Sequence, residues 1–351
     1  MKVEVETYGE VDGKAVDLIT LSNDNGMVVR VTNYGCIVTS IEVPDRDGAL
    51  ADVVLGYESL DKYLAGHPFF GAIAGRFANR IEDGRFSIDC RRYQLETNEP
   101  PTVQHLHGGS KGFDKYVWGY DLEERDDAVM IHLHRMSPDG ESGYPGSLLV
   151  THTIGLTESN ALHYDFRAVS DKPTIVNLVN HSYYNLAGHD SGSVADHQLT
   201  LFADFYTPVA ETMIPTGEIR TVADSAMDFR APVRIGDRME GIEGGGFDFN
   251  YILHGKQKHG DYRMAADLYD PSSGRFMKVM TTQPAIQFYN GFKLSNKPWF
   301  GRNGCKYEAF GGLCLETQGY PDAPNKPHFP SAVLRPGDVY QHRTIHQFGT
   351  R

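Results

Sequence analysis

Residues 161–168 read Ala-Leu-His-Tyr-Asp-Phe-Arg-Ala, an alternation of apolar and polar side chains. Successive side chains of an extended chain point to opposite faces, so the four apolar residues at positions 162, 164, 166 and 168 share one face. His163, Asp165 and Arg167 share the other. This pattern is typical of a half-buried antiparallel strand, with one face on a core and one face in water.

Comparable stretches recur along the whole chain. They cover residues 27–31, 36–43, 85–95, 129–135, 147–154, 261–269, 275–282 and 285–289. Turn pairs punctuate them, at Asp12-Gly13, Asp47-Gly48, Asp83-Gly84, Asp139-Gly140 and Ser273-Gly274. A short helix is indicated at residues 58–64, with Ser59 as its candidate N-cap. No linker-like segment divides the chain, so the sequence predicts an all-β protein in which residues 1–351 form one large antiparallel β-sandwich with few short helices.

The charge and hydropathy of the chain exclude several function classes. The formal net charge is −13 and Lys and Arg form no run, which argues against a nucleic-acid partner and against anionic membranes. No apolar stretch approaches ~18 residues, and the N-terminus lacks the apolar run of an export signal. We therefore expect a cytoplasmic protein with no membrane partner, and the sequence leaves monomer and homodimer equally open.

Several stretches rich in glycine, histidine and amides stand out from the strand pattern. They are residues 75–81, 106–115, 180–188, 246–250, 283–289 and 313–325. Neutral sugars are bound by planar amides and charged groups that match their hydroxyls, and by aromatic rings that cover their C–H surface. Side chains of this kind are Asn79, Arg80, His107, Tyr183, Asp248 and Gln287. The sequence therefore predicts a site for a small sugar.

An acid and a base complete that site. His181 lies in a polar, glycine-ended turn, and Glu316 lies on a strand where it opposes Leu313 and Leu315. Reference pKa values near ~6.5 for His and ~4.3 for Glu leave the carboxylate ionised and part of the imidazole protonated at neutrality. From these values we expect Glu316 to accept a proton and His181 to donate one.

These stretches, in this order, closely resemble the aldose 1-epimerase (galactose mutarotase) family. The resemblance runs from residues 33–35 and 44–57 to residues 334–340. It implies an antiparallel β-sandwich with a cleft, an isomerase that interconverts the α- and β-anomers of a free aldose, His181 as general acid and Glu316 as general base. It also implies substrate contacts at Asn79, Arg80, His107, Ser182, Tyr183, Asp248 and Gln287 and requires no cofactor. One departure is the longer loop before the Leu-His-Gly-Gly motif, which places His105 just before that motif and can reshape one rim of the cleft.

Other functions stay open at this point. A non-catalytic carbohydrate-binding sandwich would use the same amides and aromatics, and a glycosidase could use Asp248 and Glu316 as its two carboxylates. An epimerase of a phosphorylated sugar would need a basic cluster, and galactose, glucose and a disaccharide such as maltose are equally compatible with the residues.

A metal site is the remaining alternative. His105 with His107, or His132 with His134, would share a strand face, but neither pair has a third ligand nearby in sequence. The cysteines at positions 36, 90, 305 and 314 form no Cys-x-x-Cys pair and predict reduced thiols. We therefore expect no catalytic metal.

Overall fold

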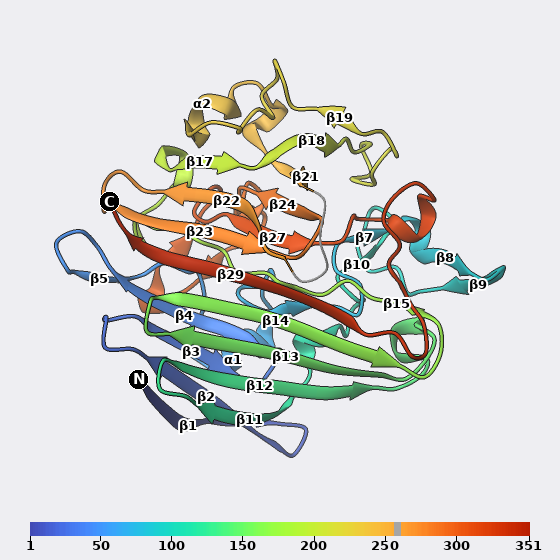
Figure 1. The fold of residues 1–351 in the computed structure, drawn as a ribbon, viewed down its shortest axis with the longest axis horizontal. Coiled ribbons are helices and arrows are strands. Elements are labelled where there is room, and N and C mark those ends of the chain that lie inside the picture. The colour runs from blue at the N-terminus through green and yellow to red at the C-terminus, as the bar shows by residue number, and fades with distance from the viewer. Residues whose placement is uncertain (256–260) are drawn as a thin grey trace.

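The largest sheet of the protein has nine antiparallel strands (Figure 1). The fold is that of a computed structural model, which describes residues 1–255 and 261–351. In spatial order the nine strands are β11 (Gly119–Glu124), β12 (Ala128–Ser137), β13 (Leu148–Thr157), β14 (Ala161–Ser170), β29 (Tyr340–Thr350), β23 (Arg275–Thr281), β22 (Arg263–Tyr269), β17 (Gln198–Leu201) and β20 (Val233–Arg234). The C-terminal strand β29 thus lies in the middle of the sheet, where it joins the meander of β11 to β14 to the later strands.

Two five-stranded sheets accompany it. The N-terminal sheet runs β1 (Lys2–Val11), β2 (Lys14–Ser22), β3 (Val28–Thr32), β4 (Ile37–Pro44) and β5 (Leu50–Asp52). The second sheet runs β19 (Arg220–Thr221), β18 (Ala203–Thr207), β21 (Asp248–Leu253), β24 (Ala285–Tyr289) and β27 (Cys314–Gln318). This second sheet carries several of the predicted site residues.

Short two-stranded ladders and helices complete the fold. The ladders pair β6 (Ile73–Ala74) with β16 (Val179–Asn180), β7 (Arg80–Ile81) with β10 (His105–Leu106), β8 (Arg85–Ile88) with β9 (Arg91–Gln94), β15 (Thr174–Ile175) with β28 (Val333–Leu334), and β25 (Trp299–Phe300) with β26 (Lys306–Tyr307). The α-helices of the described ranges are α1 (Leu60–Ala65) and α2 (Ile235–Met239), and none there is long and apolar enough to cross a membrane. The predicted all-β sandwich with few short helices is confirmed.

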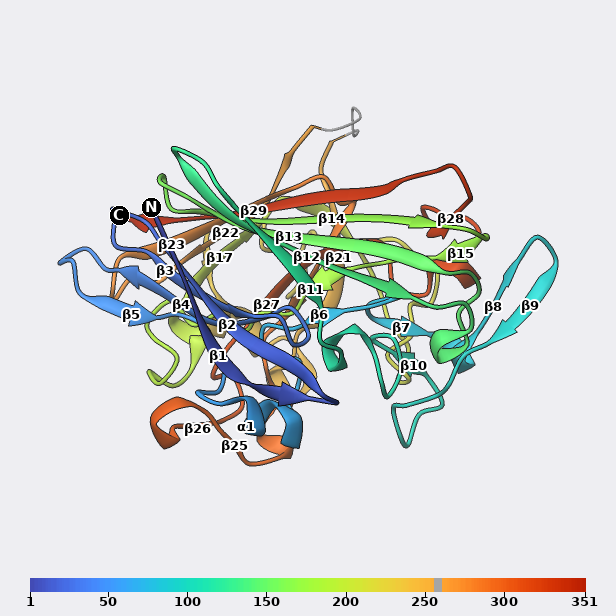
Figure 2. The same cartoon turned by 90° about the horizontal axis from the view of Figure 1, so that it is seen from below.

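The main core lies between these layers. The apolar face of β14, which includes Leu162, Tyr164 and Phe166, is buried as its alternation predicts. It belongs to one hydrophobic cluster with residues of the N-terminal sheet, such as Val29, and of the second sheet, such as Phe288. Seen along its edge in Figure 2, the nine-stranded sheet forms one layer above the N-terminal strands. The core therefore unites both ends of the chain and fixes β27 against the large sheet.

Two local predictions need correction. Residues 85–95 were expected to form one strand, but they form the hairpin of β8 and β9, which turns at Asp89 and Cys90. Both turn residues have positive φ, 49° and 64°, so the chain reverses there although it lacks the usual Asn-Gly signal. Ser59 stands at the N-cap of α1, but its side chain makes no capping hydrogen bond.

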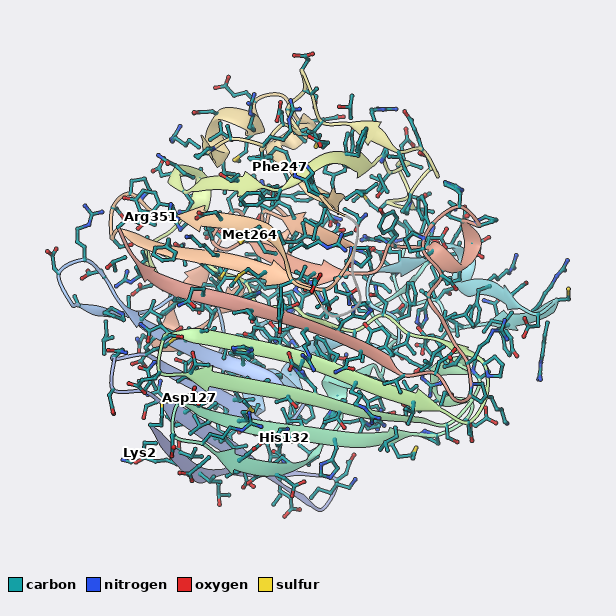
Figure 3. The ribbon with its side chains drawn as sticks, in the orientation of Figure 1. Lys2, Asp127, His132, Phe247, Met264 and Arg351 are labelled. Carbon is teal, nitrogen blue, oxygen red and sulfur yellow. The ribbon has the colours of Figure 1, made fainter. Side chains whose placement is uncertain are left out.

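The outer face of the nine-stranded sheet holds one of the suspected histidine pairs. His132, labelled in Figure 3, hydrogen-bonds through its Nδ1 to the Thr153 hydroxyl at 2.9 Å, and its Nε2 lies 2.9 Å from Glu123 Oε2. His134 is exposed and lies 3.7 Å from Asp121 Oδ2. Both rings thus have partners from the neighbouring strands, as polar side chains on a solvated sheet face commonly do.

Candidate active site

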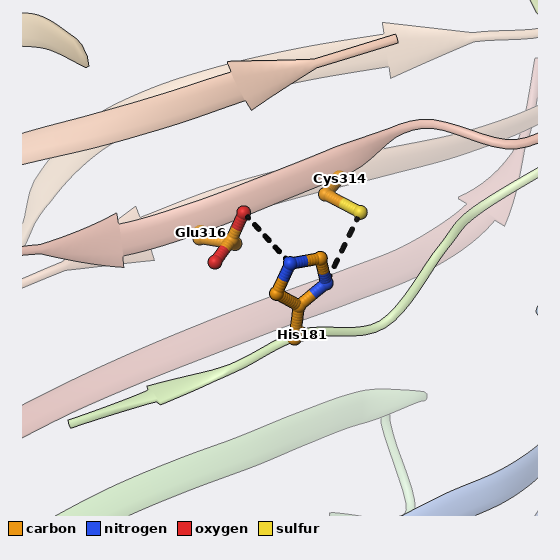
Figure 4. A group of neighbouring side chains, drawn as sticks. All are labelled: His181, Cys314 and Glu316. Atoms are coloured by element: carbon orange, nitrogen blue, oxygen red, sulfur yellow. Dashed lines mark hydrogen bonds and ion pairs between the residues drawn. The ribbon is translucent and has the colours of Figure 1, made fainter. Parts of the chain in front are cut away.

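The predicted acid and base meet in a buried cleft. Glu316 is the central residue of β27 and lies directly opposite Gln287 of β24. His181 follows β16, and its backbone is fixed on both sides, because its amide donates to Ala72 O at 2.9 Å and its carbonyl accepts from Gly71 N at 3.1 Å. His181 Nε2 lies 3.6 Å from Glu316 Oε1 (Figure 4). The two side chains are about 6% and 4% exposed, so the pair is almost excluded from water.

A third side chain touches this pair. Cys314, two residues before Glu316 on the same face of β27, places its Sγ 3.5 Å from His181 Nδ1. The imidazole therefore stands between the sulfur and the carboxylate and presents a different nitrogen to each (Figure 4). Within the part of the chain that the structure describes, these three residues are also the group whose ligand atoms lie close enough to hold a metal ion. Taking one ligand atom from each residue, these atoms all lie within 4.8 Å of one another.

Burial changes the charge state expected from reference values. Desolvation raises the pKa of Glu316 well above its usual range, and the nearby Asp248 raises it further, against the opposing effect of Arg80. Desolvation lowers the pKa of His181 to about 4. Both directions oppose the expectation of an ionised Glu316 beside a protonated His181 and favour the neutral carboxylic acid beside the neutral imidazole. Both arrangements contain one shared proton, so they are tautomers of the same pair.

A second histidine lines the cleft in a fixed state. His107 follows β10 in a left-handed conformation, with φ at 51°, and its Nδ1 accepts a hydrogen bond from the backbone amide of Asn79 at 3.1 Å. Asn79 is also left-handed, with φ at 63°, and its Oδ1 accepts from Arg80 N at 2.8 Å. Because the amide occupies the lone pair of Nδ1, a neutral His107 carries its proton on Nε2. Burial holds the pKa of His107 well below its usual value, so it stays a neutral hydrogen-bond donor.

A polar network forms another side of the site. Arg80, 6% exposed, binds Glu99 through Nε at 2.7 Å and Nη2 at 2.5 Å, and its Nη1 lies 3.8 Å from Asp248 Oδ2. Gln287 Nε2 donates to Asp248 Oδ1 at 2.7 Å. The side-chain amide of Gln318 donates in turn to Gln287 Oε1 at 3.0 Å. These bonds hold the guanidinium and the carboxylate in place before any ligand arrives.

Aromatic rings wall the cleft, whose volume is about 320 Å³. The ring of Phe69 stacks at 5.7 Å from that of His181 and lies 4.6 Å from that of His107. Tyr183 also stacks on the His181 ring, with 5.1 Å between ring centroids. Trp299 and Lys297 also line the cleft, with the lysine Nζ 5.7 Å from the indole ring. Such flat apolar walls with polar groups between them suit the two faces of a pyranose ring.

The structure gathers most of the predicted residues, with two exceptions. Asn79, Arg80, His107, His181, Tyr183, Asp248 and Glu316 line the cleft. Ser182 does not line it, and its hydroxyl donates to Asn180 Oδ1 at 2.7 Å. Gln287 lies behind Asp248, and its two polar ends are engaged by Asp248 and Gln318. His105 also points elsewhere, with its two nitrogens 2.7 Å from Glu96 O and 2.6 Å from Tyr144 OH.

The sequence reasoning missed Phe69, Glu99, Lys297 and Trp299, which line the cleft from loops and short strands. The sequence does hold one sign of Phe69. It lies between Pro68 and Phe70, in a segment that shows no strand pattern. A larger cleft, of about 910 Å³, is lined by residues such as Arg263, Tyr320 and Tyr340 and contains none of the predicted site residues. Its size alone assigns it no chemistry.

Comparisons with known proteins point in one direction. The family model described as aldose 1-epimerase matches residues 17–347. The chain is 44% identical to the galactose mutarotase of Homo sapiens over 344 residues, which is 97% of each chain. It is 37% identical to the aldose 1-epimerase of Escherichia coli (strain K12) over 346 residues, which is 96% of each chain.

Solved structures agree with these sequence matches. An aldose epimerase homologue from C. elegans has a TM-score of 0.87 and 28% identity, and the alignment covers 96% of this chain and 99% of that one. A galactose 1-epimerase from Lactobacillus acidophilus NCFM has a TM-score of 0.85 and 30% identity, with 99% of both chains covered.

Proposed function

Because the chain belongs to the aldose 1-epimerase family, we propose that it interconverts the α- and β-anomers of a free aldose with Glu316 as base and His181 as acid. The observation that carries this proposal is the buried pair, with Nε2 and Oε1 3.6 Å apart at the cleft. The pair shares one proton, and a ring opening needs one proton accepted and one donated. A sugar hydroxyl and ring oxygen between the two groups would complete that path.

The steps balance without any further reagent. Ring opening begins from the ion-pair tautomer: the Glu316 carboxylate takes the proton of the C1 hydroxyl, and His181 gives its Nε2 proton to the ring oxygen. The bond between C1 and the ring oxygen breaks, which leaves an open-chain aldehyde, and the C1–C2 bond rotates. On closure the new hydroxyl attacks C1, returns its proton to His181, and the carbonyl oxygen takes the proton back from Glu316. The pair ends in its starting state, as a catalyst must.

The remaining polar groups would hold the sugar. Arg80 and Asp248 are pre-positioned by their mutual contact and by Glu99 and Gln287, so they can bind hydroxyls without first being ordered. His107, fixed as an Nε2–H donor, would donate to an oxygen near the reacting end. Ser182 and Gln287, predicted as direct contacts, would act through the groups they hold.

The other functions are weaker explanations of this site. A binding module has no need to bury an acid and a base against each other, since that burial is unfavourable for both charged forms. A glycosidase would use two carboxylates, but here Asp248 bonds Gln287 and Glu316 faces His181. A disaccharide or a phosphorylated sugar stays a candidate substrate, because Lys293 and Lys297 line the cleft as basic groups in addition to Arg80.

The proposal also covers location and partners. Four cysteines without a disulfide suit the reducing cytoplasm. The partner is a small sugar, with neither nucleic acid nor membrane involved, and no cofactor or metal takes part.

Polarimetry tests the proposal directly. Freshly dissolved α-anomers of galactose, glucose, maltose and glucose 6-phosphate are followed with and without protein, and the spontaneous rate is subtracted. We expect the protein to accelerate mutarotation of at least one free aldose. In a separate assay with chromogenic glycosides, we expect no cleavage. Sugar binding without acceleration would identify a binding module, and glycoside cleavage would identify a hydrolase.

A further inference from the structure

Cys314 makes a contact to which the proposed mechanism gives no role. Its thiol is fully buried, and the partner that its Sγ meets is Nδ1 of His181, the nitrogen on the far side of the ring from Glu316. Burial, together with Glu316 and Asp248, raises the pKa of this thiol well above its usual range, so it stays a neutral S–H group. A neutral thiol can either donate weakly or accept weakly, and the two possibilities predict opposite tautomers of His181.

The chemistry of the ring selects one of them. His181 exchanges its proton at Nε2, the nitrogen that faces Glu316. When Nε2 has given its proton away, the neutral ring must carry its remaining proton on Nδ1. That proton needs an acceptor, and Cys314 Sγ lies 3.5 Å from Nδ1, beside the backbone of His181 itself.

We propose that Cys314 is a positioning residue, whose sulfur accepts a hydrogen bond from Nδ1–H of His181 and so reserves Nε2 for proton exchange with the substrate and Glu316. The proposal rests on the proposed role of His181. It also distinguishes the two histidines of the cleft: in His107 the amide of Asn79 occupies Nδ1 and the proton stays on Nε2, whereas in His181 the proton stays on Nδ1.

Sulfur suits this role better than the usual partner of a histidine. A carboxylate beside Nδ1 would favour the imidazolium and hold the proton on the ring. A thiol is a weak acceptor, so it orients the ring while leaving the neutral and the protonated ring close in free energy. Sulfur and carboxylate approach different nitrogens of the imidazole, so the three groups are arranged as a hydrogen-bond relay through the ring.

The test is a direct measurement of the tautomer. Protein labelled with ¹⁵N-histidine is recorded near pH 7 without sugar, and the signals of His181 are assigned by their loss in His181→Asn. We expect the parent to show a protonated Nδ1 and a bare Nε2. A protonated Nε2 with a bare Nδ1 in the parent overturns the proposal, and this readout needs neither catalysis nor a variant of Cys314.

Variants then connect the tautomer to the rate. In Cys314→Ala, the share of the Nδ1–H tautomer should fall and kcat should drop roughly fivefold, the effect of one ordinary hydrogen bond, while KM changes little. Cys314→Ser, which keeps an acceptor, should lie nearer the parent in both readouts. Cys36→Ala is the matched control, since Cys36 is an equally buried cysteine of another hydrophobic cluster, and it should change neither.

The outcomes separate the proposals from each other. An unchanged tautomer or an unchanged kcat in Cys314→Ala overturns the positioning role, and so does a loss of rate without a tautomer shift. If the parent has the expected tautomer but accelerates no sugar, the proposed function fails while the hydrogen bond stands.

Discussion

Replacing Glu316 by Gln tests the acid and base assignment most sharply. The amide has nearly the same size as the carboxyl group and can keep the contacts of β27, but it cannot accept the C1 proton at any useful pH. Turnover should therefore fall by roughly 10²–10⁴, the usual effect of one positioned base. Sugar affinity should change little, because Arg80, His107 and Asp248 remain in place.

The dependence of kcat/KM on pH extends this prediction, because the parent and the variant should respond to pH in opposite directions near pH 4. In the parent, a second proton enters the pair below the His181 pKa of about 4, and the shared proton leaves above the raised pKa of Glu316. The singly protonated pair between those limits is active, so kcat/KM should rise through the acidic limb near 4 and stay high past the usual carboxyl range. In Glu316→Gln only His181 titrates, and its pKa stays low because burial, not Glu316, lowers it. The acidic limb should then vanish, and the residual activity should fall as pH rises through about 4.

The measurement is polarimetry of a freshly dissolved α-anomer from pH 3.5 to 9, with binding followed separately by calorimetry. Glu141→Gln is the control, since Glu141 is a carboxylate largely shielded from water that pairs with Arg135 and does not line the cleft. Residual activity that increases with pH in Glu316→Gln would show that His181 is the base. A variant within about threefold of the parent would refute Glu316 as a catalytic group altogether.

The remaining predictions concern the partner groups, metal and stability. His181→Asn should lose turnover on the same scale, and its combination with Glu316→Gln should lose less than the product of the single losses, because both act in one cycle; strict multiplicativity in the polarimetric rates would contradict this. Dialysis against a strong chelator should leave the rate unchanged, and a loss restored by a divalent ion would overturn the metal-free mechanism. Arg80→Lys should raise KM about tenfold to a hundredfold with a smaller change in kcat, because lysine cannot make the two bonds to Glu99; an unchanged KM would count against Arg80 as a sugar contact. Phe288→Ala should lower the free energy of unfolding in urea by about 3–5 kcal/mol, since the ring is fully buried, and a loss below ~1 kcal/mol would contradict the core described for β24.

Much of the fold follows from local patterns in the sequence. The alternation at residues 161–168 predicted a strand, and β14 occupies Ala161–Ser170 with its apolar face in the core. The hairpin at Asp89 and Cys90 escaped prediction because neither residue is glycine, although Asp is one of the residues that adopt positive φ more readily than most. Strand order could not be predicted either, since the place of β29 between β14 and β23 depends on contacts between residues far apart in sequence.

The site shows the same division between local and long-range information. Strand parity indicated that Glu316 and Gln287 point away from the apolar neighbours on their own strands, but not that β24 and β27 pair with these two residues opposite each other. Cys314 shares the parity of Glu316, yet its contact with His181 joins two residues that lie 133 positions apart in the sequence. Phe69 and Trp299 lie outside any regular pattern, so only the folded chain brings them to the cleft.

The charge state of the pair formed by Glu316 and His181 was predicted from reference pKa values, which take no account of burial. This prediction bears most on the mechanism. With reference values near ~6.5 and ~4.3, the ion pair would be favoured over the neutral pair by about 3 kcal/mol, at 1.36 kcal/mol per pKa unit. Such a preference would hold the proton on the histidine. Burial of Glu316 and His181 opposes it, because desolvation raises one pKa and lowers the other. A sugar that enters the cleft brings hydroxyl dipoles to both groups and restores part of the stabilisation of the charged forms. With the preference for the ion pair reduced in this way, the shared proton can pass from the carboxylic acid to the imidazole when a substrate is there to receive it.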